Sequence, residues 1–508
     1  MTVKRAYIII LIAGFIIRLA ALALQPAFCD EAFIYFVTKS ESLLRILAND
    51  PHPPLWNYIM RLPVSLTANI ALLRLPALLF SMLSIHAAFT LGCRVKDEKT
   101  GLAIAGFASL CYPVWLAEMQ LRPNAVLSWL TLILVIMMHE IYKEGRPRRG
   151  WLLFTAAALC CASVHYLGAA AVFFFLAATL FTSSRKKAAA CLAIALIPIS
   201  AWLWWTHNGN ASNTVLVTSN HLRALSAPAS LCGLETAIDV MADDTSNEKA
   251  GGLNQQNAAW RLAFSIPLWI LLFAGIASLA HQEKFPALLL SGTFVFPALL
   301  LMAGSILGKG IYQNRYLLFV SVPMALLIYA GSDSLTGSLR KISNALLLII
   351  AGANILISLA FPFTQSLWNQ YWKSTISFIE SNQSPGDNIC IFIPYSTMTF
   401  AMDYDPGSIS VDFTADGNYD IRNTPSPGKL KLIPLDNGMA GDYKFLDYLA
   451  QSNVFLVLCQ EEMRDNSRIM AALDERFTPV LHFRNKSYVY WSDAECYLLT
   501  PKKNSGQP

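Results

Sequence analysis

The chain has 508 residues, of which 55% are hydrophobic and only 14% are charged. Soluble globular domains usually carry about 25% charged residues, so this composition excludes an ordinary soluble protein and indicates an integral membrane protein. The net charge of +5 would suit an acidic partner if the basic residues gathered on one face. They fall mainly between apolar segments, where membrane topology explains them, and we expect no nucleic-acid partner.

The ten cysteines form no C-x-x-C pair, and several lie in or beside apolar runs as small hydrophobic residues would. We therefore expect neither a cysteine metal cluster nor a disulfide scaffold. The first apolar run, residues 6–24, follows Lys4 and Arg5, which would also suit a signal peptide. Its length and the many further apolar runs favour a first membrane span instead.

Apolar windows of about 17 to 25 residues, each near the length that crosses a bilayer, predict about eleven transmembrane helices. The windows are 6–24, 73–93, 101–118, 123–141, 151–166, 168–182, 188–205, 261–280, 286–304, 316–331 and 342–361. The fold class is thus an α-helical polytopic membrane protein. The pairs at 101–141 and 151–182 admit other divisions.

Cationic residues indicate the orientation of these helices. With the N-terminus inside, the loops after helices two, four, six, eight and ten are cytoplasmic and rich in Lys and Arg, as the positive-inside rule requires. The opposite side then holds two long loops, 25–72 and 206–260, and the tail. We predict two domains, a transmembrane domain at 1–361 and an extracytoplasmic domain at 362–508. Loops of such length usually carry function.

The tail differs from the rest of the chain. Its segments "GDNICIFIP", "SNVFLVLC" and "KSYVYWS" are β-rich, whereas "EEMRDNSRIMAALDERF" has helical spacing of apolar residues. The helical segment "YWKSTISFIESNQ" precedes them. This pattern predicts a small α/β domain.

Two adjacent carboxylates, Asp30 and Glu31, follow the first span in "AFCDEAFIYF". In the first turn of the next helix they would be capping residues that interact with the helix dipole. A carboxylate at the membrane surface could also accept a proton from a hydroxyl or hold a divalent metal. Because the two residues are adjacent, one carboxylate could cap the helix while the other serves as proton acceptor or metal ligand.

The segment "NDPHPPLWNY" in the same loop has three prolines within four positions, which make its backbone rigid. It is either a stiff connector or a wall that holds Asp50 and His52 toward a pocket.

The segment "WLAEMQLRPN" joins the third and fourth spans and contains Glu118 and Arg122. On a helix, residues four apart share a face and form an ordinary ion pair. Alternatively, Arg122 binds phosphate, for which a guanidinium group is well suited, and Glu118 orients it or the substrate.

The segment "GKGIYQNRY" precedes the tenth span and contains Lys309, Tyr312 and Arg315. These residues are either an interfacial anchor or a grip on an anionic lipid headgroup. His165 ends the fifth span on the outer side. Arg18 lies inside the first span, where cations usually face the bundle interior and find a partner.

These motifs, in this order, resemble the GT-C superfamily of polyprenyl-phosphate-dependent glycosyltransferases. The branch they resemble contains the protein O-mannosyltransferases, the lipid A aminoarabinose transferases and transferases related to those of lipopolysaccharide core synthesis. The motifs are "CDEA", "HPPLW", "AEMQLRPNAVL", "VHYLG" and "NRYLLF". Asn124 departs from the family pattern, in which tyrosine is usual.

The resemblance implies an enzyme that transfers a sugar from a polyprenyl phosphate to a lipid, glycan or protein hydroxyl, with inversion. It implies Asp30 as the general base, supported by Glu31. Substrate-binding roles follow for Asp50, His52, Glu118, Arg122, His165, Lys309, Tyr312 and Arg315. The cations would neutralise the donor phosphate, whose charge grows in the transition state.

The expected location is a bacterial inner membrane, with the site and the tail on the periplasmic or extracellular side. Whether a divalent metal takes part stays open, since Asp30 and Glu118 with a histidine could ligate one. Three alternatives also stay open: a transporter or flippase of a lipid-linked sugar, a ligase using a diphosphate-linked donor, and a membrane scaffold.

Overall fold

The structure is a computed structural model that describes residues 2–25, 27, 29–40, 53–144, 148–181, 185–208, 227–233, 255–304, 314–360, 372–392, 394–413, 419–435, 439, 442–459, 467–485 and 494–502. It divides into two compact units. Unit 1 comprises residues 1–23, 47–59 and 74–362, and unit 2 comprises residues 24–46, 60–73 and 363–508. The predicted domain boundary at 361/362 falls at an undescribed segment and stays a prediction.

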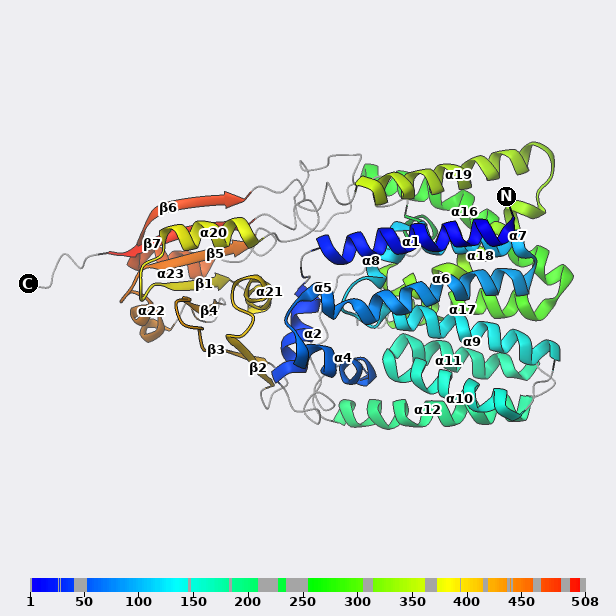
Figure 1. The fold of residues 1–508 in the computed structure, drawn as a ribbon, viewed down its shortest axis with the longest axis horizontal. Coiled ribbons are helices and arrows are strands. Elements are labelled where there is room, and N and C mark those ends of the chain that lie inside the picture. Colours follow the sequence, from blue (N-terminus) through cyan, green and yellow to red (C-terminus); the bar gives the residue numbers. More distant parts are fainter. Residues whose placement is uncertain are drawn as a thin grey trace, which may run out of the picture. The chain divides into compact units, whose positions relative to one another are not determined.

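Unit 1 is built from long apolar helices (Figure 1), and every predicted window falls on one of them. The helices are α1 (Val3–Leu24), α6 (Leu75–Val95), α7 (Glu98–Leu110), α8 (Tyr112–Glu118), α9 (Asn124–Glu144), α10 (Arg148–Val164), α11 (Tyr166–Ala178), α12 (Arg185–Asn208), α16 (Gln255–Gln282), α17 (Lys284–Gly304), α18 (Ser321–Ser334) and α19 (Gly337–Ala360). Short elements between them are η1 (Thr179–Phe181), α14 (Ala227–Leu231) and η3 (Asn314–Val320).

The polytopic helical membrane fold is confirmed, with fewer full-length spans than predicted. Within the described residues, seven helices are long and apolar enough to cross a membrane, and the bent pair of α7 and α8 makes up to eight. Helices α10 and α11, with 17 and 13 residues, would rise only about 25 and 20 Å at 1.5 Å per residue. Both are shorter than the typical transmembrane helix of about 20 residues.

Close packing of small residues joins the helices of unit 1. Helix α16 packs against α18, where a Cβ atom added to Gly275 would lie 1.9 Å from the Leu327 carbonyl oxygen. Gly331 is equally close to the Leu271 carbonyl. Such backbone contact is typical of helix association in lipid, which brings no hydrophobic driving force of its own. Outer helices such as α1 and α19 expose large apolar side chains, including Ile16 and Leu348.

Ion pairs gather at one end of the unit 1 helices. They join residues at or near the ends of α6, α9, α16, α18 and α19: Arg94–Glu140, Lys143–Glu283, Arg340–Asp333 and Lys96–Asp333. Residues Asn124 and Glu140 lie near opposite ends of α9, about 24 Å apart at 1.5 Å per residue. The cationic loops therefore gather at the end of α9 that is remote from the "ExxxRP" junction.

Unit 2 contains a five-stranded mixed sheet in the order β4-β1-β5-β7-β6. Its strands are β1 (Asn388–Phe392), β4 (Lys431–Leu435), β5 (Val454–Cys459), β6 (Phe477–Asn485) and β7 (Ala494–Pro501), and the hairpin of β2 (Ile409–Phe413) and β3 (Tyr419–Asn423) forms a second sheet. Strand β1 is parallel to β4 and β5, whereas β7 is antiparallel to β5 and β6. Helices α20 (Trp372–Asn382), α21 (Pro394–Tyr404), α22 (Tyr443–Leu449) and α23 (Ser467–Arg476) complete the C-terminal part. The predicted α/β region is confirmed.

Buried aliphatic side chains of the central strands and of α22 and α23, such as Leu456, Leu446 and Leu473, form the core of this α/β region. The predicted strands at 388–392 and 454–459 and the predicted helix near 467–476 are present. The segment "KSYVYWS", predicted as a strand, lies outside the described residues.

The first long loop contains three helices among its described residues. Helices α2 (Cys29–Ser40) and α5 (Ile70–Leu73) belong to unit 2, and α4 (Leu55–Leu66), which contains Pro63, runs across the sequence boundary between the units.

Candidate functional site

The predicted catalytic carboxylates lie in the first turn of α2. Asp30 is partly exposed, whereas Glu31 is fully buried. Carboxylates at this position are stabilised by the positive end of the helix dipole, so the capping interpretation is supported for both. Asp30 also retains the solvent access that a proton acceptor needs.

Helix α2 is fixed to the C-terminal part of unit 2. It packs against α21 and β2, and its residues Ala32, Tyr35 and Phe36 are buried. Lys39 at its end donates hydrogen bonds to the Tyr35 hydroxyl at 3.1 Å and to the Pro406 carbonyl at 3.3 Å. The α/β region therefore holds the helix that carries Asp30.

A second polar centre, in unit 1, is built on the break between α7 and α8, which meet at 62°. Pro113 has no N–H group, and the Tyr112 N–H donates to Asn354 Oδ1 at 2.7 Å. In a continuous helix these two positions would bond the carbonyls of Ser109 and Ala108. The break therefore releases two carbonyl groups inside the bundle.

Arg18 forms hydrogen bonds with these released carbonyls. Its guanidinium donates to the carbonyls of Ser109 and Ala108, both at 2.9 Å. It also donates to Ser81 Oγ at 2.5 Å and to Glu118 Oε2 at 3.1 Å, and Ser81 donates to the same carboxylate oxygen. Arg18 is completely buried and Glu118 is 3% exposed. A buried charge pair of this kind is stable only when such additional hydrogen bonds are made.

The expectation of a helical pair between Glu118 and Arg122 is wrong. Helix α8 ends at Glu118, and Arg122 lies in the following turn, where its N–H donates to the Gln120 carbonyl at 2.7 Å. The two residues therefore do not share a helix face, and the ion pair recorded for Glu118 is with Arg18. Pro123, after Arg122, immediately precedes α9, and its carbonyl accepts from the Leu127 N–H at 2.9 Å.

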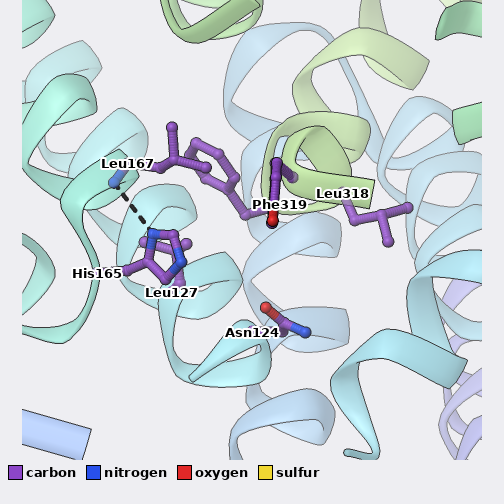
Figure 2. Close-up of a pocket in the computed structure, with 7 residues that line it drawn as sticks. Asn124, Leu127, His165, Leu167, Leu318 and Phe319 are labelled. Atoms are coloured by element: carbon purple, nitrogen blue, oxygen red, sulfur yellow. Dashed lines mark hydrogen bonds between the residues drawn. The ribbon is translucent and has the colours of Figure 1, made fainter. Parts of the chain in front are cut away.

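His165 and Asn124 line one small pocket with η3 (Figure 2), whose lining comprises Asn124, Leu127, His165, Leu167, Tyr316, Leu318 and Phe319. His165 is the N-cap of α11, and its Nδ1 accepts from the Leu167 N–H at 3.1 Å. Because Nδ1 is an acceptor, the proton of the neutral ring is on Nε2, which is a donor. Asn124, in place of the family's tyrosine, donates to the Ala117 carbonyl at 3.1 Å.

Residues from three of the sequence motifs line this pocket. The "ExxxRP" junction ends at Asn124, "VHYLG" contains His165, and "NRYLLF" forms η3. All three lie in unit 1. Arg315 is in η3, although its side chain is not described, and Asp50, His52, Lys309 and Tyr312 lie outside the described residues.

Residues 51–205 match the family model of dolichyl-phosphate-mannose-protein mannosyltransferases. Over this segment, about a third of the chain, the sequence is similar to that glycosyltransferase family. The matched segment contains the "HPPLW", "ExxxRP" and "VHYLG" motifs. No curated protein sequence matches the chain significantly.

Solved structures show the fold of the whole chain. ArnT from Cupriavidus metallidurans bound to undecaprenyl phosphate has a TM-score of 0.52 and 12% identity, and the alignment covers 99% of both chains. Its apo form has a TM-score of 0.50 and 9% identity, covering 97% of this chain and 98% of that one. The chain therefore has the ArnT-like GT-C fold.

The sequence did not predict the partners that build the polar centre of unit 1. Ser81 and Asn354 are each buried in an apolar span, and this placement of a polar residue was the available signal. Among the described residues, no group of three or more His, Cys, Asp or Glu side chains is arranged to hold a metal ion.

Proposed function

We propose that the protein transfers a sugar from a polyprenyl-phosphate donor to a hydroxyl acceptor on the non-cytoplasmic face of the membrane, inverting the anomeric carbon. The family match over residues 51–205 carries the proposal. The ArnT structure with undecaprenyl phosphate supports it through the shared fold.

Asp30 is the proposed general base. Its carboxylate would take the proton of the acceptor hydroxyl as the oxygen attacks the anomeric carbon, and the phosphate would leave with the electrons of the broken C–O bond. Partial exposure of Asp30 and the rigid attachment of α2 support this role, because a base must be both accessible and fixed. Buried Glu31 would support the helix start.

Cations would stabilise the leaving phosphate. Arg122 and Arg315 belong to unit 1 segments that flank the His165 pocket, in the junction before Asn124 and in η3. Guanidinium groups suit phosphate geometry, and Lys309 and Tyr312 would assist. His165 would donate from Nε2. Glu118 would act as a positioning residue, because its carboxylate is already engaged by Arg18.

The cationic loops of unit 1 support a proposal for the side of the membrane on which the site lies. The cationic loops lie at the end of α9 opposite Asn124, and cationic loops face the cytoplasm. The site would then be on the periplasmic or extracellular side, where a lipid-phosphate headgroup at the membrane surface can reach it.

Mass spectrometry of envelope glycans, lipids and proteins tests the proposal. Cells with the protein should contain a glycosylated product that deletion removes and that complementation restores. Lipid movement by the purified protein in liposomes, without glycosidic bond formation, would instead establish a flippase.

A further inference from the structure

A cleft in unit 2 lies beside the start of α2. It has a volume of about 210 Å³ and is lined by Ala27, Ala68, Asn69, Ile70, Met402 and Asp403. These residues come from the segment before α2, the segment entering α5 and the end of α21. All three segments belong to unit 2, so the cleft is formed within one compact body.

The cleft is close to the proposed base. Ala27 lies three residues before Asp30, and an extended chain spans at most about 3.6 Å per residue, so their Cα atoms are within about 11 Å of each other. A ligand in the cleft can therefore extend toward the Asp30 carboxylate.

Two polar groups define what the cleft can bind. Asn69 Oδ1 accepts from the N–H groups of Ala71 at 2.9 Å and Leu72 at 3.4 Å, which leaves the Nδ2 amide as the donor of that side chain. Asp403 is exposed and offers only acceptor oxygens when ionised. Met402, Ile70 and two alanines supply apolar surface.

This combination suits a sugar ring. Hydroxyl groups can donate to the carboxylate and accept from the amide, while the C–H face of the ring packs on the apolar lining. A phosphate or carboxylate ligand would be repelled by Asp403. The acceptor group favoured here is therefore a neutral carbohydrate.

We infer that this cleft binds the acceptor of the transfer reaction, and that the bound part is an uncharged sugar held by Asp403 and Asn69. The inference rests on the proposed function only in identifying the bound sugar as part of the acceptor. The binding chemistry follows from the cleft alone.

Saturation-transfer NMR on the full chain in nanodiscs tests the inference with methyl α-mannoside, methyl α-glucoside and methyl β-galactoside as probes. At least one should bind, and Asp403→Asn, which keeps the side-chain shape, should weaken binding about tenfold. Asn69→Asp keeps the helix-capping oxygen and replaces the donor, so it should weaken binding as much. Asp474→Asn removes an exposed carboxylate of α23 outside the cleft and should change nothing.

Three results would overturn the inference: no glycoside binds, binding is unchanged in both cleft variants, or glucose 6-phosphate or threonine amide binds better than the neutral glycosides. Thermal unfolding equal to that of the unchanged protein establishes that each variant is folded. If an envelope product depends on the protein but Asp403→Asn binds the glycosides as well as the unchanged protein does, the cleft inference fails and the proposed function stands. If no product exists, the proposed function fails whatever the glycosides do.

Discussion

Arg18 and Glu118, one hundred residues apart in the sequence, form a buried ion pair with 3.1 Å between Nη2 and Oε2. The pair joins the first span to the helix break at the "ExxxRP" junction. The two carbonyls released by that break accept further hydrogen bonds from the same guanidinium group. The first span therefore stabilises the sharp turn in the helix path that leads to Arg122.

The first prediction concerns this pair. Arg18→Leu should destabilise the protein by about 3–5 kcal/mol, because it leaves a buried carboxylate without its cation. Arg18→Leu combined with Glu118→Leu should be less destabilised than Arg18→Leu alone. Thermal or denaturant unfolding of the purified protein in detergent measures both. Equal or additive losses would show that the two charges do not depend on each other.

The second prediction concerns Asn354. Its Oδ1 accepts from the Tyr112 N–H, and its Nδ2 donates to the Cys232 carbonyl at 2.8 Å. Asn354→Leu should cost about 2–4 kcal/mol, since two buried backbone groups lose partners at about 1–2 kcal/mol each. Asn354→Asp keeps the acceptor and should cost less when both variants are compared by unfolding. An Asn354→Leu protein as stable as the unchanged one would contradict the role of this residue in the break.

Much of this architecture can be predicted from the sequence. There is a physical reason why the other parts could not be predicted. Apolar run length located every long helix, because spanning helices must be apolar along their length. The pairing of Arg18 with Glu118 was not predicted, since one sequence does not reveal which distant helices touch. Helical spacing suggested Arg122 as the partner of Glu118. That suggestion failed because α8 ends at Glu118 and the next helix, α9, begins only at Asn124.

The α/β region shows the same limit. Strands β1 and β5 are central and buried, and their apolar sequences predicted them. Strand β6 is at a sheet edge with Val480 and Leu481 exposed, so its pattern carried no clear alternation. The attachment of α2 to α21 and β2 depends on long-range packing, which the sequence of either segment leaves undetermined.

The third prediction separates the two roles of His165. His165→Asn should preserve the helix cap, because asparagine is a good N-cap residue, and should lower kcat/KM about tenfold through loss of the Nε2 donor. His165→Phe should lower it as much and also reduce stability by about 1 kcal/mol. Transfer assays and unfolding curves measure these effects. Full activity of His165→Asn would assign His165 to capping alone.

The fourth prediction concerns the donor. Arg315→Ala should raise KM for the polyprenyl-phosphate sugar about tenfold or more, because a charge-assisted phosphate contact is lost. Arg340→Ala, in the first turn of α19 and ion-paired with Asp333, is the matched control and should leave KM unchanged. Steady-state assays with varied lipid donor decide the matter. An unaltered KM in Arg315→Ala would remove this residue from the phosphate site.

The central claim is glycosyl transfer with Asp30 as the base, and single-turnover transfer by Asp30→Asn tests it most directly. The purified protein would be added to membranes from cells that lack it, together with radiolabelled lipid-linked sugar prepared from the same organism. The unchanged protein and a Glu475→Gln control should move the label to an envelope acceptor. Asp30→Asn should bind the donor normally and transfer about 100 to 10,000 times more slowly. Transfer by Asp30→Asn within a few-fold of the unchanged rate would contradict the account.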